Sequence, residues 1–198
     1  MRHPLYPNPA IPLAEHPPAV LLAMCLFGEG RGESEQTRRA IAQVIVNRAR
    51  YPHPVFGSKR GLPFHENVIQ VILKPCQFSC FLSSDVNYSK LLDPLAHDSS
   101  DIWTGCLRLA TEFINLPQQT DTLTLNSDHY FDDSIQAPPW ADPAKATVTI
   151  GRLRFFRLYL PVLQTGPGSV APSGSGQAAA LPPSLSASDR KSTRLNSS

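Results

Sequence analysis

An unbroken apolar stretch, residues 19–27, leads directly into residues 28–33, whose sequence is Gly-Glu-Gly-Arg-Gly-Glu. A stretch that is apolar on every side belongs in the interior, so residues 18–27 are expected to form a short buried helix. The glycines that follow carry no Cβ and allow an unusual turn or the close approach of a ligand. A glutamate held there behind apolar side chains is in surroundings that raise a carboxyl pKa and create a general acid. A simple turn that places a charge at the start of the next helix is the alternative.

The chain has 198 residues, of which 41% are apolar, enough for one domain with a hydrophobic core. Its prolines gather towards the two ends. Residues 1–17 are expected to be an extended, proline-rich leader, and residues 18–161 the domain. Residues 162–188 are rich in Gly, Pro, Ser and Ala, which is typical of a disordered tail. Residues 189–198 resemble the translation of a short-read sequencing adapter and are expected to be an artefact.

The formal net charge of +2 arises entirely from residues 189–198, which hold three basic residues and one acidic residue. The rest of the chain balances at zero, so charge gives no reason to expect binding to nucleic acid. No apolar run is long enough to cross a membrane, and residues 1–18 lack the basic and apolar regions of a secretory signal. We therefore expect a protein that is cytoplasmic as synthesised, without stable membrane insertion.

The four cysteines and six histidines give no metal-binding pattern. Cys76 and Cys80 are separated by three residues, and no second pair follows at the spacing of a zinc finger. The cysteines are expected to be small buried hydrophobic residues, and no metal or cofactor is expected.

Helical periodicity returns after Ser34, which is placed to cap a helix with Glu35 in its first turn. That helix is expected to end at Tyr51-Pro52 and to bury one face. The face consists of Thr37, Ile41, Val44, Ile45 and Ala49. A third helix is expected over residues 66–73 and a fourth over residues 100–116.

The apolar pattern then changes to the period of strands. Strands are expected at residues 123–125 and 129–131, and a second strand or hairpin over residues 147–150 and 153–159. Helices first and a short antiparallel sheet last indicate an α+β fold.

Two carboxylates four positions apart, Glu29 and Glu33, are the leading candidates for chemistry. Cleavage of a glycosidic bond needs an acid to protonate the leaving oxygen, and often a second group to stabilise the positive centre. The three glycines argue against a continuous helix, so the two side chains are not assumed to reach one site. For Glu33, a charge that stabilises the start of the next helix is the competing explanation.

Downstream segments supply groups that suit a sugar, which offers hydroxyls for hydrogen bonds and an apolar face for stacking. The loop Gln77-Phe78-Ser79 combines an amide, an aromatic ring and a hydroxyl, although a capped turn with a buried Phe fits equally. Trp140, after two prolines, is either a sugar-stacking platform or a residue packed over the core. His129 is either a structural hydrogen-bond partner or a site residue.

Six short motifs occur in order between about residues 20 and 160, and together they resemble the SleB-type cell-wall hydrolase family. The family is named for the spore-cortex-lytic enzyme and includes small phage and proteobacterial proteins. The motifs are residues 22–33, Val44-Ile45-Val46-Asn47-Arg48, Gln77-Phe78-Ser79-Cys80, His129-Tyr130, Pro139-Trp140-Ala141 and Ile150-Gly151-Arg152. The chain departs from the family at Gly30, where Ala is usual, and at Phe131 and Leu153, where His is common.

The resemblance implies a lysozyme-like α+β fold, related to lytic transglycosylases, that acts on peptidoglycan. The family's catalytic acid corresponds to Glu29, and its sugar-site residues correspond to Gln77, Ser79, His129 and Tyr130. We expect Trp140 to join them, and we expect supporting roles for Arg31, Glu33 and Asn47.

The expected reaction is cleavage between N-acetylmuramic acid and N-acetylglucosamine, as a lytic transglycosylase or a muramidase. An inactive peptidoglycan-binding module and a cell-wall amidase are the alternatives. The protein is expected to act as a monomer, in the periplasm or the cell wall, and to reach the wall through a partner such as a holin.

Overall fold

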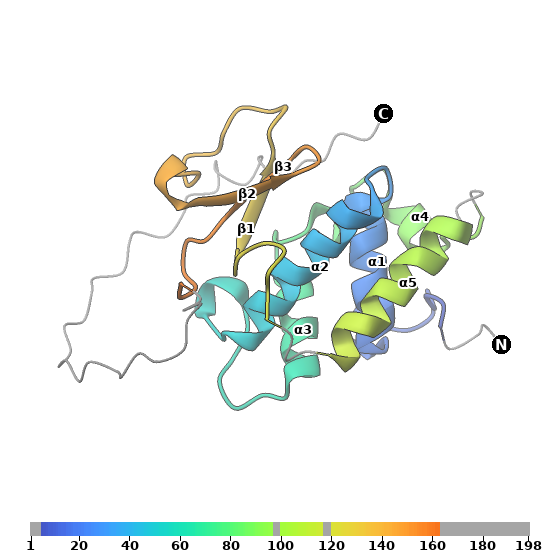
Figure 1. Ribbon diagram of the computed structural model, residues 1–198. Helices are drawn as coiled ribbons and strands as arrows, with labels where there is room; N and C mark the ends of the chain where they lie inside the picture. The colour runs from blue at the N-terminus through green and yellow to red at the C-terminus, as the bar shows by residue number, and fades with distance from the viewer. Residues whose placement is uncertain (1–4, 97–99, 117–119, 163–198) are drawn as a thin grey trace.

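The computed structural model describes residues 5–96, 100–116 and 120–162, and it combines a helical core with a small sheet (Figure 1). The helices are α1 (Pro18–Gly30), α2 (Glu35–Arg50), α3 (Phe64–Ile72), α4 (Tyr88–Leu92) and α5 (Ser100–Asn115). The strands are β1 (His129–Asp132), β2 (Ala146–Ile150) and β3 (Leu153–Phe156), arranged antiparallel in the order β1-β3-β2. The expected α+β fold is confirmed. Apart from residue 162, the expected tail and the adapter-like segment lie outside the described residues.

Helix α1 is the centre of the helical core. Every side chain from Val20 to Phe27 is at most 1% exposed, and the helix packs against α2, α3, α4 and α5. The expectation that the helix ends at Phe27 is wrong, because it continues through Glu29 to Gly30. Glycine disfavours a helix by about 1 kcal/mol, but close packing favours it here: a Cβ on Gly28 would lie 2.5 Å from Cys80 Cβ.

The segment before α1 packs against the helical core. Tyr6 stacks on Trp103 with ring centroids 6.1 Å apart. His16 is 3% exposed, and its Nε2 accepts a hydrogen bond from the backbone of Asn8 at 2.9 Å. The described part of the leader therefore contributes to the core surface.

Helix α2 forms as its sequence predicts. The Ser34 side chain accepts the Thr37 N–H at 3.1 Å, which caps the helix, and Tyr51 follows its last turn. All five residues of the predicted apolar face are buried. Helix α5 begins at Ser100 as expected, and α3 begins before the expected residue 66, at Phe64. The short helix α4 was not predicted.

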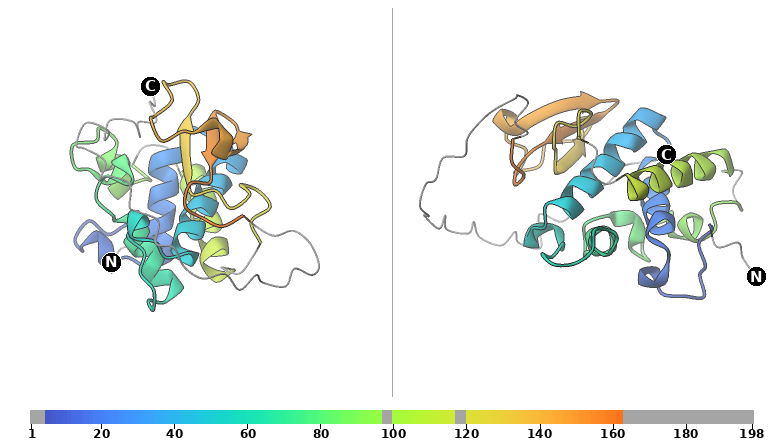
Figure 2. Two further views of the ribbon diagram at one scale, coloured as in Figure 1. Left: turned by 90° about the vertical axis from the view of Figure 1, so that its left-hand side faces the viewer. Right: turned by 60° about the horizontal axis from the view of Figure 1, so that its bottom comes forward.

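The sheet packs on the α2 side of the helices, as both views of Figure 2 show. Strands β2 and β3 are joined at Gly151, whose φ of +60° suits the first central position of a type II′ turn. The strand expected at residues 123–125 is wrong. Leu125 and Asn126 both have positive φ, and the segment curls around the buried Asp121 carboxylate, which accepts three backbone N–H groups.

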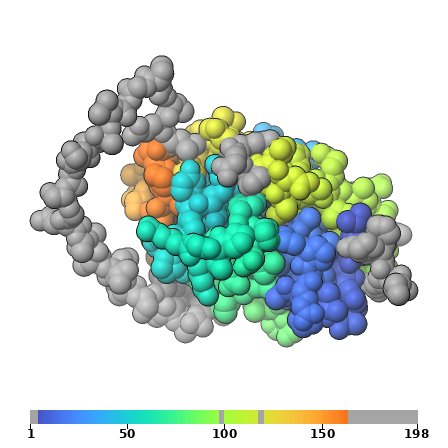
Figure 3. All heavy atoms as spheres, turned by 90° about the horizontal axis from the view of Figure 1, so that it is seen from below, coloured from blue at the N-terminus to red at the C-terminus, as the bar shows by residue number. Residues whose placement is uncertain are grey.

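Seen from below, the segment that connects α2 to α3, together with α3, covers the middle of the molecule between the sheet and the N-terminal segment (Figure 3). Three of the four cysteines are buried as expected: Cys25, Cys80 and Cys106. Cys76 is exposed, with a φ of +61°, so the expectation is wrong there. Within the described residues, no helix is both long and apolar enough to span a bilayer.

Candidate functional site

Glu29 is a buried carboxyl in the last turn of α1. Its residue is 6% exposed, and burial raises its pKa from 4.5 to about 7. Hydrogen bonds from the thiol and backbone N–H of Cys80 and from the Tyr130 hydroxyl oppose the rise, and the negative charge of Asp85 adds to it. A carboxyl that keeps its proton near neutral pH can donate that proton to a leaving group.

Three segments bring these groups together. Cys80 belongs to a 3-10 turn, Ser79–Phe81, that lies directly against Gly28. Tyr130 comes from β1 and is 8% exposed. Cys25 stands one helical turn before Glu29 on the same side of α1, and its thiol is hydrogen-bonded to that of Cys80. The carboxyl is therefore surrounded by groups from the helical core and from the sheet.

Arg31 is directed towards the loop that follows the 3-10 turn. Its Nη2 donates to Asn87 Oδ1 at 2.7 Å, and the backbone N–H of Asn87 donates to Asp85 Oδ1 at 2.8 Å. These two bonds tie the loop to the end of α1. Asp85 is consequently the second carboxylate near Glu29, a position that no sequence pattern indicated.

Glu33 has a different set of contacts. Its carboxylate pairs with Arg152 at 2.6 Å, and its side chain is 11% exposed. The Glu33 carboxylate also lies near Gly151, close to Thr37 at the start of α2. The residue thus ties the β2–β3 turn to the helical core.

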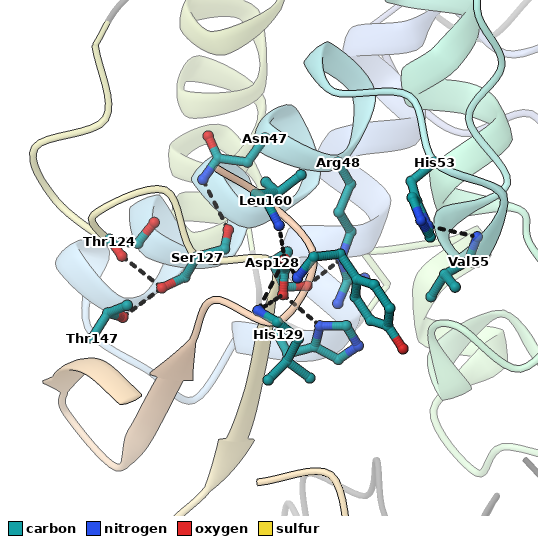
Figure 4. Close-up of polar contacts among 12 residues, drawn as sticks. Asn47, Arg48, His53, Val55, Thr124, Ser127, Asp128, His129, Thr147 and Leu160 are labelled. Atoms are coloured by element: carbon teal, nitrogen blue, oxygen red, sulfur yellow. Dashed lines mark hydrogen bonds and ion pairs between the residues drawn. The ribbon is translucent and has the colours of Figure 1, made fainter. Parts of the chain in front are cut away.

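Asn47 and Arg48 connect α2 to the segment before β1 (Figure 4). The fully buried Asn47 amide donates to Asp121 Oδ2 at 2.8 Å and to the Ser127 carbonyl at 2.9 Å. Arg48 Nε donates to the Asp128 carbonyl at 2.6 Å. Asn47 therefore supports the strand that carries Tyr130, and it has no described contact with Glu29.

Asp128 ties the start of β1 to the segment that follows β3. Its carboxylate accepts three consecutive backbone N–H groups, those of residues 158–160, and lies 2.7 Å from His129 Nδ1. Burial raises the pKa of Asp128, but the bonds from His129 and from the backbone outweigh it and hold the pKa below its usual value. Burial lowers the pKa of His129, which favours a neutral ring.

His129 and Trp140 lie on the other face of the sheet from Glu29. Successive side chains of a strand point to opposite faces, so His129 points away when Tyr130 points to the helices. The His129 ring is 5.0 Å from the Trp140 ring, and Trp140 packs edge-on against Phe131 and Phe156 at 6.0 and 5.6 Å. Trp140 therefore covers the sheet face opposite to Tyr130, whereas His129 lies between Trp140 and Phe56 of the helical core, with the Phe56 ring centroid 6.0 Å away.

The predicted site residues thus fall into separate groups. Tyr130 contacts Glu29, and Gln77 and Ser79 lie half-buried on the segment that supplies Cys80. Sequence reasoning missed Cys80, Asp85 and Arg48 as neighbours of Glu29. Cys80 and Arg48 are the last residues of two of the six motifs, and their place in those motifs is the sequence signal that could have indicated them. No three His, Cys, Asp or Glu side chains of the described segments gather as a metal site.

Glu29→Gln is expected to stabilise the protein at high pH. Glu29 keeps its proton up to about pH 7 in the folded state, whereas an unfolded chain releases that proton above the ordinary pKa of 4.5. The contribution of Glu29 to stability is therefore fully present below pH 4.5 and is lost as pH rises through about 7. The glutamine variant suffers no such loss, and above pH 7 its free energy of unfolding should exceed the wild-type value by about 3 kcal/mol. Urea unfolding at pH 4.5 and pH 8 measures it, and an equal difference at both pH values would contradict it.

Asp128→Ala is expected to lower the free energy of unfolding by about 2 kcal/mol, because three backbone N–H groups lose a buried acceptor. The sign with pH follows from the lowered pKa: the stabilisation is present at neutral pH and disappears as acid protonates the carboxylate. Urea unfolding at pH 7 measures the loss. The exposed Asp133 provides the control, since Asp133→Ala should stay within about 0.5 kcal/mol of wild type.

Comparison with known proteins gives one family. The sequence profile of the cell wall hydrolase family matches residues 32–156, from just after Glu29 to the end of β3. No curated protein and no solved structure matches the chain.

Proposed function

The chain belongs to the cell wall hydrolase family, and on that premise we propose that it cleaves the glycan strands of peptidoglycan with Glu29 as its catalytic acid. The bond broken joins N-acetylmuramic acid to N-acetylglucosamine. The observation that carries the proposal is the burial of Glu29, which raises its pKa to about 7. The family match begins at residue 32, so the role of Glu29 rests on its chemistry.

The reaction needs only one proton-transferring group. Protonated Glu29 donates its proton to the glycosidic oxygen as the bond from that oxygen to the muramic acid C1 breaks. The resulting carboxylate then takes a proton from an attacking hydroxyl, which forms the new bond to C1. If the hydroxyl is the sugar's own 6-OH, a 1,6-anhydro end results. If it is water, a reducing end results. In both cases Glu29 regains its proton.

The neighbours of Glu29 fit this cycle. Cys80 and Tyr130 hydrogen-bond to the carboxylate form, and they stabilise it after the proton has left. Asp85 and burial act against that form and keep the proton in place before the reaction. Gln77 and Ser79, on the segment that supplies Cys80, are proposed to hydrogen-bond the sugar.

Mass spectrometry of the products released from purified sacculi tests the proposal. We expect disaccharide muropeptides, with anhydro ends for a transglycosylase or reducing ends for a muramidase. Free stem peptides and intact glycan would instead show an amidase, and activity removed by a chelator would support that reading. Binding to sacculi without any release would show a binding module. Either of these results overturns the proposal.

A further inference from the structure

Arg48 is a buried guanidinium between the two halves of the domain. The residue is 4% exposed, and its Cζ lies 5.4 Å from the Phe56 ring centroid and 5.8 Å from that of Phe78. Its Nε is bonded to the Asp128 carbonyl, as Figure 4 shows, whereas its Nη1 has no hydrogen-bond partner among the described residues. A buried charge with an unused donor is costly unless neighbouring charges compensate it.

Arg48 lies beside both segments that hold Glu29. Its Cζ lies over the Phe78 ring, two residues before Cys80, and its Nε bonds the Asp128 carbonyl, two residues before Tyr130. The carboxyl groups of Asp128 and Glu29 both act electrostatically on its guanidinium. Arginine keeps its proton at any physiological pH, so the positive charge is permanent. It lies on the α2 side of the site, whereas the negative charge of Asp85 comes from the loop fastened to Arg31 through Asn87.

We propose that Arg48 is a positioning residue for the reaction at Glu29: its buried positive charge favours the carboxylate that remains after the proton has passed to the leaving oxygen, and its bond to the Asp128 carbonyl fixes the strand that presents Tyr130. This inference rests on the proposed function. Arg48 and Asp85 then act on the same carboxyl with opposite signs. Arg48 makes Glu29 a stronger acid and Asp85 makes it a weaker one.

The remaining titratable neighbours do not duplicate the charge of Arg48. The groups that act on Glu29 come from every element around it, and those other than Arg48 are neutral or negative. They are Cys25 from α1, Cys80 from the 3-10 turn, Asp85 from the loop and Tyr130 from β1. Arg31 is the other guanidinium at this end of α1, and its Nη2 is bonded to Asn87 in the loop that carries Asp85. Removing Arg48 therefore removes the positive charge that acts on Glu29 from the α2 side.

Titration of Glu29 by carbon-13 NMR tests the inference without any need for activity. The side-chain carboxyl signal is assigned by its absence in Glu29→Gln. Arg48→Gln keeps an amide donor for the Asp128 carbonyl but removes the charge, and it should raise the titration midpoint of Glu29 by about one pH unit. Arg48→Lys keeps the charge and should shift the midpoint by less than about half a unit. Equal midpoints in both variants would overturn the inference.

A second measurement uses the wild-type chain, in case the Arg48 variants do not fold. The guanidinium nitrogen signals of Arg48 should move with the titration of Glu29, and the movement should disappear in Glu29→Gln. Signals that stay fixed through that titration would overturn the inference.

Activity on sacculi separates this inference from the proposed function. In Arg48→Gln the alkaline limb of the pH–rate profile should move up with the midpoint, and the maximal rate should fall about tenfold. A midpoint that depends on Arg48 in a protein without activity rejects the proposed function alone. If Arg48→Gln keeps full activity and the titration midpoint of Glu29 is unchanged, the positioning role alone is rejected.

Discussion

Glu29→Gln is expected to reduce the release of muropeptides from purified sacculi by about 10³-fold. Glutamine has the shape of glutamic acid but no proton to give, and the mechanism requires Glu29 to donate a proton and then to accept one. The loss should appear at every pH, because the missing group has no protonation state that restores it. Release is measured by chromatography of the soluble products over time.

Glu33→Gln is the matched control, since it makes the same chemical change four residues away. Glu33 pairs with Arg152 at 2.6 Å and ties the β2–β3 turn to the helical core, so its loss removes an ion pair and not the proposed acid. Its muropeptide release should stay within about tenfold of wild type. Retained turnover in Glu29→Gln, or equal losses in the two variants, would show that Glu29 is not the acid.

Stability distinguishes a catalytic loss from a folding defect in Glu29→Gln. The same substitution is expected to remove activity and to stabilise the fold above pH 7, because burying a carboxyl there is unfavourable to folding. A damaged fold would lose both. The opposite signs follow from one observation, the raised pKa of Glu29.

The parts of the fold that sequence predicted are those set by local rules. The Ser34 cap and the five-residue apolar face of α2 follow from side chains three and four positions apart, and the structure confirms both. The order of helices before strands likewise follows from the change of period. The strand expected at residues 123–125 failed because a buried carboxylate, Asp121, gathers the backbone there into a turn.

The surroundings of Glu29 could not be predicted in the same way. Cys80, Asp85, Tyr130 and Arg48 lie on four different segments, and only the packing of those segments brings them together. Family resemblance singled out Glu29 and Tyr130 but also His129, the next residue along the strand. Because neighbouring strand residues face opposite ways, His129 does not share the Tyr130 face and instead packs between Trp140 and Phe56.

Gly28→Ala is expected to destabilise the protein by about 3 kcal/mol and to lower muropeptide release by about 10²-fold. The new Cβ would lie 2.5 Å from Cys80 Cβ and 2.7 Å from Cys80 Sγ. Cys80 Cβ is attached to the backbone, so the 3-10 turn must move away from α1. That movement withdraws two of the hydrogen bonds made to Glu29.

Two neighbouring glycines show whether the effect comes from close packing. A Cβ on Gly30 would meet Arg38 Cγ at 3.0 Å and Ile41 Cδ1 at 3.2 Å, contacts that a shift of a few tenths of an ångström in those side chains relieves. On Gly32 it would meet nothing within 4 Å. Alanine favours a helix by about 1 kcal/mol over glycine, which offsets the close contacts at Gly30, so Gly30→Ala should be close to neutral. Gly32 lies in the turn after α1 with open space around it, so Gly32→Ala should be harmless. Urea unfolding and sacculus assays of the three variants give the comparison. If Gly28→Ala matches Gly32→Ala in stability and in activity, the contact with Cys80 does not hold Glu29 in place. If Gly28→Ala is the one variant of the three that loses stability and activity, that contact is what allows a glutamate to be buried at the end of α1.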